Sequence, residues 1–166
     1  FNVHECVLKD GECYKTLDSW WQILTTLLEQ QFGRDGAIVA LGGGVVGDMA
    51  GFAASVYQRG IPFVQIPTTL LAMVDSSVGG KTAINHPLGK NMIGTFYQPK
   101  AVMADLNCLK TLPQKEISAG LGEVVKTGII YDKEFFDFLK NDIEKTFDHD
   151  LATISHIVKR CCEIKA

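Results

Sequence analysis

The stretch from Ala37 to Tyr57 passes from an aliphatic segment to a cluster of glycines and then to a second apolar segment. Its first five residues are all aliphatic, which is typical of a strand buried on both faces of a parallel sheet. Gly42, Gly44 and Gly47 follow in the spacing G-x-G-x-x-G, which lets backbone N–H groups approach a pyrophosphate at a helix N-terminus. A plain tight turn fits the same spacing, so the motif alone leaves both interpretations open.

A second apolar segment, Pro62 to Ile66, predicts another buried strand and closes a β-α-β unit whose crossover is expected to be right-handed. Thr68 and Thr69 follow that segment and therefore lie at the carboxyl end of the strand. Because open α/β sheets bind ligands at this edge, we expect the glycine turn and the two threonines to face one crevice. Residues 101–104 predict a further short strand.

The N-terminal region predicts a strand followed by a helix. Residues 1–8 have the pattern of a strand, and the apolar residues between positions 17 and 28 recur at helical spacing. Ser19 and Gln22 have the spacing of a capping box, and Gly33 is expected to end the helix.

The character of the chain changes at Thr111, which is expected to cap a helix, and everything beyond it predicts helix, with Asp132 as a later cap. The expected fold class is therefore α/β. A parallel-sheet domain that binds a nucleotide covers residues 1–111, and the beginning of an all-helical domain covers residues 112–166.

The composition excludes several classes of partner. Of the 166 residues, 46% are hydrophobic, and the formal net charge is −3, so the chain can bury a core and shows no bias toward nucleic acid. No apolar run approaches the roughly 20 residues of a membrane helix and no signal peptide opens the chain, so we expect a cytoplasmic protein with no membrane partner. The 5 cysteines are scattered and never spaced C-x-x-C, which favours reduced core thiols over disulfides or a zinc site.

Three lysines are the first candidates for chemistry. Lys81 and Lys90 each follow a glycine in expected loops, where the backbone can approach an anion while the ammonium group supplies charge. Lys126 follows Glu123 by three residues and shares its face of a helix expected over residues 118–130. A solvated lysine or a surface ion pair is the alternative in each case, but the glycines inside this helix favour close packing near a site.

Two aspartates lie beside glycine-rich segments, Asp48 and Asp75, and each fits either a helix cap or a ligand contact. Their glycine-rich neighbours favour the ligand contact. The 4 histidines show no H-x-x-x-H pair, so none is predicted as a metal ligand, and His86, before Pro87, is expected to organise a turn.

Several blocks of sequence, in one order, carry a resemblance to a known family. The blocks are Asp10-Gly-Glu-Cys-Tyr-Lys15, Gly42-Gly-Gly-Val-Val-Gly-Asp48, Thr68-Thr69, Asp75-Ser-Ser-Val-Gly-Gly-Lys81, Asn85-His-Pro-Leu-Gly-Lys-Asn91, Cys108-Leu-Lys-Thr111 and Glu123-Val-Val-Lys126. The run from Ala40 to Lys126 closely resembles the 3-dehydroquinate synthase family of sugar-phosphate cyclases, and the likeness extends at lower density from Asp10 to Ala166. The resemblance implies an N-terminal α/β domain that binds NAD, a C-terminal helical domain that holds a divalent metal, and a site between them.

The resemblance also implies roles for particular residues. NAD would contact Asp10, Gly11, Glu12, Cys13, Tyr14, Lys15, Gly44, Val45, Val46, Gly47, Asp48, Thr68, Thr69, Lys81, Lys90, Cys108, Leu109, Lys110 and Thr111. Substrate would contact Asp75, Lys81, Lys90, Asn91 and Lys126, with Arg59 reaching the phosphate site of a neighbouring subunit. Glu123 would be one ligand of the metal, zinc or cobalt. The two histidine ligands of the family lie in a later segment that this sequence lacks, so we expect the central fragment of the enzyme, without activity of its own.

The implied reaction converts 3-deoxy-arabino-heptulosonate 7-phosphate, a small phosphorylated sugar acid, to 3-dehydroquinate and phosphate in a homodimeric enzyme. NAD⁺ transiently oxidises one hydroxyl, phosphate leaves, the hydride returns, and ring opening with aldol closure forms the carbocycle. Another sugar-phosphate cyclase, or an NAD- and metal-dependent alcohol dehydrogenase of the glycerol dehydrogenase type, is the alternative. A nucleotide-binding or folding fragment without turnover is a further one.

Overall fold

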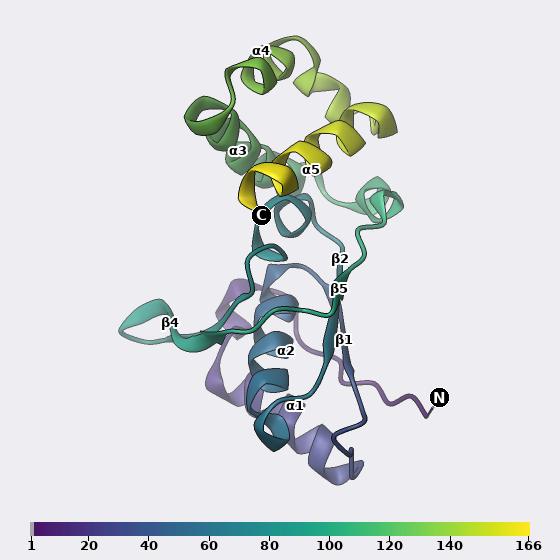
Figure 1. The fold of residues 1–166 in the computed structure, drawn as a ribbon, viewed down its shortest axis with the longest axis vertical. Coiled ribbons are helices and arrows are strands. Elements are labelled where there is room, and N and C mark those ends of the chain that lie inside the picture. The colour runs from purple at the N-terminus through teal and green to yellow at the C-terminus, as the bar shows by residue number, and fades with distance from the viewer. Residues whose placement is uncertain (1) are drawn as a thin grey trace.

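The computed structural model describes residues 2–166, which form an α/β part and a helical part stacked along the longest axis of the molecule (Figure 1). In chain order the elements are η1 (Glu12–Tyr14), α1 (Leu17–Glu29), β1 (Ile38–Gly42), α2 (Gly44–Val56), η2 (Tyr57–Arg59), β2 (Phe63–Pro67), η3 (Ala72–Ser76), β3 (Lys81–His86), β4 (Gly89–Phe96), β5 (Ala101–Val102), η4 (Leu106–Thr111), α3 (Gln114–Tyr131), α4 (Lys133–Asp142), η5 (Ile143–Thr146) and α5 (Leu151–Lys165). The expected α/β class with a helical portion after it is confirmed.

A parallel sheet with the strand order β1-β2-β5 forms the centre of the α/β part. The register of β1 and β2 runs from Ile38 opposite Phe63 to Gly42 opposite Pro67. Because α2 connects these two strands, the predicted β-α-β unit is confirmed. Both strands end at one edge, where the N–H of Thr68 donates to the carbonyl of Gly42 at 2.9 Å.

Helix α2 packs closely on the sheet and on β3. Met49 and Ala53 of this helix are fully buried, as is Phe63 of β2. A Cβ added at Gly51 would lie 2.5 Å from Thr82 and 2.9 Å from Phe63, so this face of the helix has no room for a side chain. The small residues of α2 thus set the distance between helix and sheet.

The N-terminal region differs from its prediction. Residues 2–8 pair with no strand in the described part of the chain, so the expected strand over residues 1–8 is wrong, and its first residue lies outside that part. Thr16 caps α1, because its extended backbone directs its hydroxyl to the N–H of Ser19 at 3.3 Å. Ser19 is therefore inside the first turn, and the helix ends at Glu29, before Gly33.

One face of strand β1 is open to solvent. Val39 and Leu41 are 59% and 63% exposed, whereas Ala40 between them is buried. Successive side chains of a strand point to opposite faces, and α2 covers the face of Ala40. The expectation that β1 is buried on both faces is therefore wrong for the described residues.

Residues 81–96, in which we expected glycine-flanked loops, form the antiparallel hairpin β3-β4, which projects from the α/β part (Figure 1). A Cβ added at Gly94 would lie 2.0 Å from the carbonyl oxygen of Thr82, so the close approach of the strands requires glycine here. At the turn, Nδ1 of His86 accepts from the N–H of Leu88 at 3.1 Å. This contact confirms that His86 organises a turn.

A second core lies among α3, α4 and α5 and includes residues from the α/β part of the sequence. Leu70, Met73 and Leu109 belong to this core. A Cβ added at Gly120 would lie 2.8 Å from Leu70, which confirms that the glycine-bearing helix packs closely against a neighbour. The second core thus crosses the boundary expected near residue 112, and that boundary stays a prediction.

Of the two helix caps expected for α3 and α4, one is wrong and the other is confirmed. Thr111 lies in η4, and Pro113 precedes the first turn of α3, so the expected Thr111 cap is wrong. Asp132 caps α4 as predicted, since it accepts from the N–H of Phe135 at 3.0 Å, and it also accepts from Nε of Arg160 at 2.6 Å. These two bonds, that of Phe135 first, lower the pKa of Asp132.

Asp132→Asn is expected to destabilise the protein more at pH 7 than at pH 3. A carboxyl group whose pKa is lowered on folding contributes stability above its unfolded pKa, about 3.9, and that contribution is lost as the pH falls through the folded pKa. Urea midpoints at the two pH values measure the difference, with Asp137→Asn, the exposed partner of Lys140, as the matched control. An Asp132→Asn effect that is equal at both pH values would contradict the role of its charge.

Candidate functional site

A cleft of about 1300 Å³ opens at the edge of the sheet where β1 and β2 end. Its walls come from the segment before α1, the glycine turn, η3, the hairpin and the start of α3. The predicted site residues on these walls are Asp10, Gly11, Glu12, Lys15, Gly44, Val45, Val46, Asp48, Thr68, Thr69, Asp75, Lys81 and Asn91. The volume exceeds the roughly 300–1000 Å³ of typical small-molecule pockets, so a dinucleotide fits by size.

The glycine turn presents the N-terminus of α2 to this cleft. Strand β1 ends at Gly42, the helix begins at Gly44, and Gly43 between them supplies no side-chain cap. The first N–H groups of a helix have no partner within the helix, and the helix dipole favours negative charge at this end. The turn therefore has the chemistry of a phosphate site.

The ammonium group of Lys15 joins three predicted segments at the cleft. Its Nζ donates to Oδ2 of Asp48 at 2.5 Å and to Oδ1 of Asn91 at 2.6 Å, although Lys15 is 4% exposed. Asn85 extends the network, because it accepts from the N–H of Asn91 at 2.9 Å and donates to Glu12 at 2.7 Å. Burial raises the pKa of Asp48 in spite of the bond from Lys15. Elements η1, α2 and β4 are thus held together by one buried cation.

A second charged contact, between Asp75 and Lys165, connects the cleft to the helical part. Asp75 lies on the π-helical turn η3, and its Oδ1 accepts from Nζ of Lys165, in the last turn of α5, at 2.6 Å. Lys165 also donates to the carbonyl of Asp75 and lines the cleft. Lys165 could not be predicted as a site residue from its position in the sequence, because a basic residue at a helix C-terminus is typical of a dipole partner and Asp75 lies 90 residues away.

Some predicted substrate and metal residues lie elsewhere. Lys81 begins β3 and lines the cleft, whereas Lys90, on β4, is not among the wall residues. Lys126 forms a surface ion pair with Glu123 on α3, and neither residue is among those that line the cleft. Arg59 lies in η2, beyond the C-terminal end of α2 and so opposite the glycine turn.

The remaining predicted nucleotide contacts are also off the cleft wall. Gly47 lines a small chamber behind the glycine turn, and Cys13 and Tyr14 are exposed on η1. Four predicted contacts form η4, namely Cys108, Leu109, Lys110 and Thr111. Leu109 is buried in the second core, and the wall instead includes the two residues that follow η4, Leu112 and Pro113.

Within residues 2–166 no group of three or more His, Cys, Asp or Glu side chains could hold a metal ion. Glu123, the predicted ligand, forms an ion pair with Lys126. The cysteines are free, and burial raises the pKa of Cys161 to about 12, so this thiol is unreactive at neutral pH. Cys13 is exposed, which corrects the expectation of core thiols for this residue.

None of the helices in the described part of the chain is both long and apolar enough to cross a membrane.

The fold and the cleft define an α/β protein with a phosphate-type glycine turn at a sheet edge and a helical part that closes one end of the cleft. The family model of the 3-dehydroquinate synthase N-terminal region matches residues 5–119, and that of the 3-dehydroquinate synthase C-terminal region matches residues 120–166. This chain belongs to the 3-dehydroquinate synthase family.

Individual relatives agree with this membership. The 3-dehydroquinate synthase of Aliivibrio fischeri (strain MJ11) is 61% identical over 170 residues, which cover 99% of this chain and 47% of the relative. The chain thus spans about half the length of the curated relatives it matches. The structure of ValA, the 2-epi-5-epi-valiolone synthase of Streptomyces hygroscopicus subsp. jinggangensis 5008 with NAD⁺ and Zn²⁺ bound, is 30% identical, with a TM-score of 0.93 over 97% of this chain and 46% of ValA. A 2-deoxy-scyllo-inosose synthase complexed with carbaglucose-6-phosphate, NAD⁺ and Co²⁺ is 40% identical, with a TM-score of 0.68 over 72% of this chain and 32% of that one.

Proposed function

We propose that this chain is the central part of a 3-dehydroquinate synthase, which converts 3-deoxy-arabino-heptulosonate 7-phosphate to 3-dehydroquinate and phosphate. The observation that carries the proposal is that one cleft gathers the glycine turn, the buried Lys15 network and the cations Lys81 and Lys165. Curated relatives of that name at 61% identity support the choice of reaction. Because the chain spans about half of those relatives, turnover belongs to the complete enzyme.

NAD fits the glycine turn, where the N-terminus of α2 would hold the pyrophosphate. Thr68 and Thr69, on the same wall, offer hydroxyl groups to the remainder of the nucleotide. When bound, NAD supplies a reversible hydride acceptor for one substrate hydroxyl. The bound NAD⁺ of ValA supports this choice of cofactor.

The substrate carries a carboxylate and a phosphate, and both need cations. Lys81 from β3 and Lys165 from α5 both line the cleft, so together they would orient the two anionic ends. Asp75, which accepts from Lys165 and also lines the cleft, would accept a hydrogen bond from a substrate hydroxyl. We also propose Lys90, Asn91 and Lys126 as substrate contacts of the complete enzyme. These residues bind and orient the substrate.

The residues described so far form neither a metal site nor a subunit interface. Glu123 alone does not hold an ion, so a zinc or cobalt site needs ligands beyond this chain. We propose a homodimer in which Arg59, at the end of α2 remote from the cleft, reaches the phosphate site of the neighbouring subunit.

Phosphate release without net formation of NADH tests the proposed reaction. The complete enzyme, given NAD and the heptulosonate phosphate, is expected to release phosphate while NADH absorbance stays flat. Accumulating NADH would indicate an alcohol dehydrogenase, and absence of phosphate release from this substrate would indicate a different sugar-phosphate cyclase. Either outcome replaces the proposal.

Lys81→Met in the complete enzyme is expected to lower kcat/KM about 10- to 100-fold, the effect of one hydrogen bond to a charged group, while NAD affinity changes little. Steady-state kinetics and calorimetric titration with NAD measure the two quantities. Lys140→Met, which removes an exposed lysine paired with Asp137 on α4, is the matched control. Full activity of Lys81→Met would make Lys81 a solvated surface lysine.

A further inference from the structure

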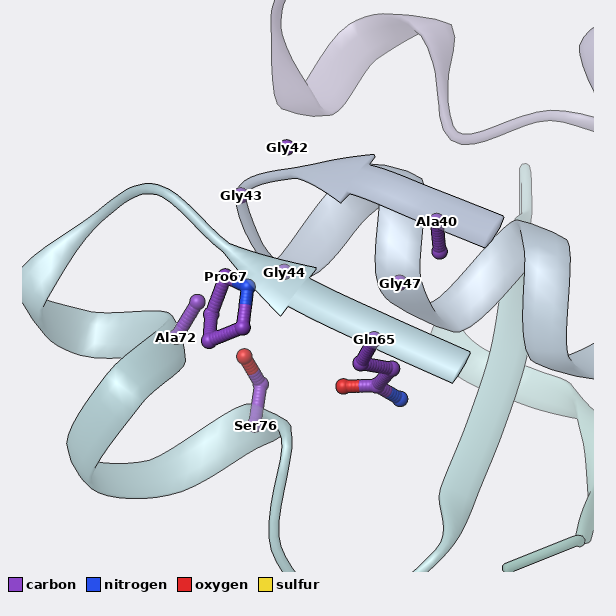
Figure 2. A pocket seen from close by; sticks show the side chains of 9 residues that line it. All are labelled: Ala40, Gly42, Gly43, Gly44, Gly47, Gln65, Pro67, Ala72 and Ser76. Atoms are coloured by element: carbon purple, nitrogen blue, oxygen red, sulfur yellow. The ribbon is translucent and has the colours of Figure 1, made fainter. Parts of the chain in front are cut away.

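A small chamber of about 10 Å³ lies directly behind the glycine turn (Figure 2). Gly44 and Gly47 of α2, Gln65 and Pro67 of β2, and Ser76 of η3 contribute to its lining. Gly44 and Ser76 also belong to the wall of the large cleft. The chamber and the cleft are therefore separated by the turn that would hold the pyrophosphate.

The hydroxyl group of Ser76 has no partner in this chamber. Its Oγ is buried and makes no hydrogen bond within residues 2–166. The carbonyl of Ala72 already accepts from the N–H of Ser77 at 3.1 Å, which is the bond of the π-helical turn, and from Oγ of Ser77 at 2.7 Å. A buried hydroxyl without a partner is costly, and native structures seldom leave one unsatisfied.

The chamber is polar on a second side. Gln65 is 5% exposed in the middle strand of the sheet, and its carboxamide lies 3.5 Å from the position of a Cβ added at Gly47. Figure 2 shows the Ser76 hydroxyl and the Gln65 carboxamide on the same side of β2, with the hydroxyl pointing toward the strand. A volume of about 10–15 Å³ with two or more polar partners is what a single buried water needs.

We infer that one ordered water occupies this chamber, bridges Ser76 Oγ and the Gln65 carboxamide, and positions the glycine turn for the nucleotide. The inference rests on the proposed NAD site and adds Ser76 as a positioning residue. Ser76 lies against the turn, since a Cβ added at Gly44 would be 2.7 Å from its Oγ. A hydrated Ser76 therefore holds η3 and the turn at a fixed separation, and this arrangement lowers the cost of ordering the turn around a phosphate.

Ser76→Ala tests the role of the hydroxyl by NAD titration and thermal unfolding of the purified protein. The variant is expected to bind NAD about three- to tenfold more weakly, the effect of one hydrogen bond, without a gain in thermal midpoint. Ser77→Ala is the matched control, because Ser77 bonds to Ala72 within η3 and is not on the chamber wall. This control is expected to lower the thermal midpoint and to leave NAD affinity unchanged.

A dry chamber predicts the opposite result. Ser76→Ala would then remove an unsatisfied hydroxyl, raise the thermal midpoint and leave NAD affinity unchanged, which would overturn the inference. Gln65→Met, which keeps length but removes the polar amide, is expected to weaken NAD binding like Ser76→Ala, and the double variant is expected to add little more. Fully additive effects would mean that the two residues do not share a water.

A high-resolution crystal structure tests the water directly and does not depend on NAD. Density for one water within about 3 Å of Ser76 Oγ and of the Gln65 carboxamide is expected, and an empty chamber would overturn the inference. If the wild-type protein fails to bind NAD but contains this water, the proposed function fails while the chamber assignment holds. If the protein binds NAD and the chamber is empty, the proposed NAD site holds while the inference about the water fails.

Discussion

Gly44→Val is expected to weaken NAD binding on the order of 100-fold or more, the loss of about two charge-assisted hydrogen bonds to the pyrophosphate. A Cβ at position 44 would lie 2.7 Å from Oγ and 3.3 Å from Cβ of Ser76, so η3 or the turn has to move. The valine side chain would also occupy space through which a phosphate approaches the N-terminus of α2. Calorimetric titration with NAD measures the change.

Gly122→Val separates this effect from a general intolerance of the larger residue. Gly122 also lies in a helix, but a Cβ added there would meet nothing within 4 Å. This control is expected to fold and to retain wild-type NAD affinity, because valine is no worse than glycine inside a helix. If Gly44→Val folds and keeps its NAD affinity, the nucleotide does not bind at the glycine turn.

The glycine turn could be predicted from sequence because its determinants are local. An aliphatic run, three spaced glycines and a second apolar run specify strand, turn and helix without reference to distant residues. The same locality explains the Asp132 cap, which bonds to the N–H three residues ahead. The position of Thr68 beside the glycine turn could also be predicted, because parallel strands of an α/β sheet end at the same edge.

The hairpin β3-β4 was missed because its strands lack the alternation that predicts a half-buried strand. Six of the eight residues of β4 are exposed, and its pairing depends on the absence of a side chain at Gly94, where the opposite backbone approaches closely. Glycine in a sequence indicates a loop more often than a tight strand contact. The expected loops around Lys81 and Lys90 therefore proved to be strands.

Contacts between residues that are far apart in the sequence could not be predicted either. Lys165 meets Asp75 only because α5 returns to η3, and Val39 and Leu41 are exposed because α2 covers a single face of β1. Burial and ion pairing of this kind depend on which elements are neighbours in space. A hydrophobic pattern specifies which residues can be buried, and the arrangement of elements decides which of them are.

The buried ion pair of Lys15 and Asp48 is expected to contribute strongly to stability. Lys15→Met and Asp48→Asn are each expected to destabilise the protein by about 3–5 kcal/mol, since either change leaves a buried group without its charged partner. The double variant is expected to be less destabilised than the sum of the two, because it removes both charges. Urea unfolding of the four proteins gives the coupling. The exposed pair of Lys140 and Asp137 is the matched control, and its coupling is expected to be close to zero.

The pH dependence of Lys15→Met distinguishes loss of the ion pair from loss of packing. Burial already raises the pKa of Asp48, and Lys15→Met removes the hydrogen bond and the positive charge that lower this pKa. A carboxyl group whose pKa is raised on folding contributes stability below its unfolded pKa, about 3.9, and loses it as the pH rises through the folded value. The destabilisation by Lys15→Met should therefore shrink as the pH falls from 7 toward the ordinary range of a carboxyl group, because Asp48 takes up a proton. If the destabilisation is independent of pH, the aliphatic stem of Lys15, rather than its charge, holds η1 against α2 and β4.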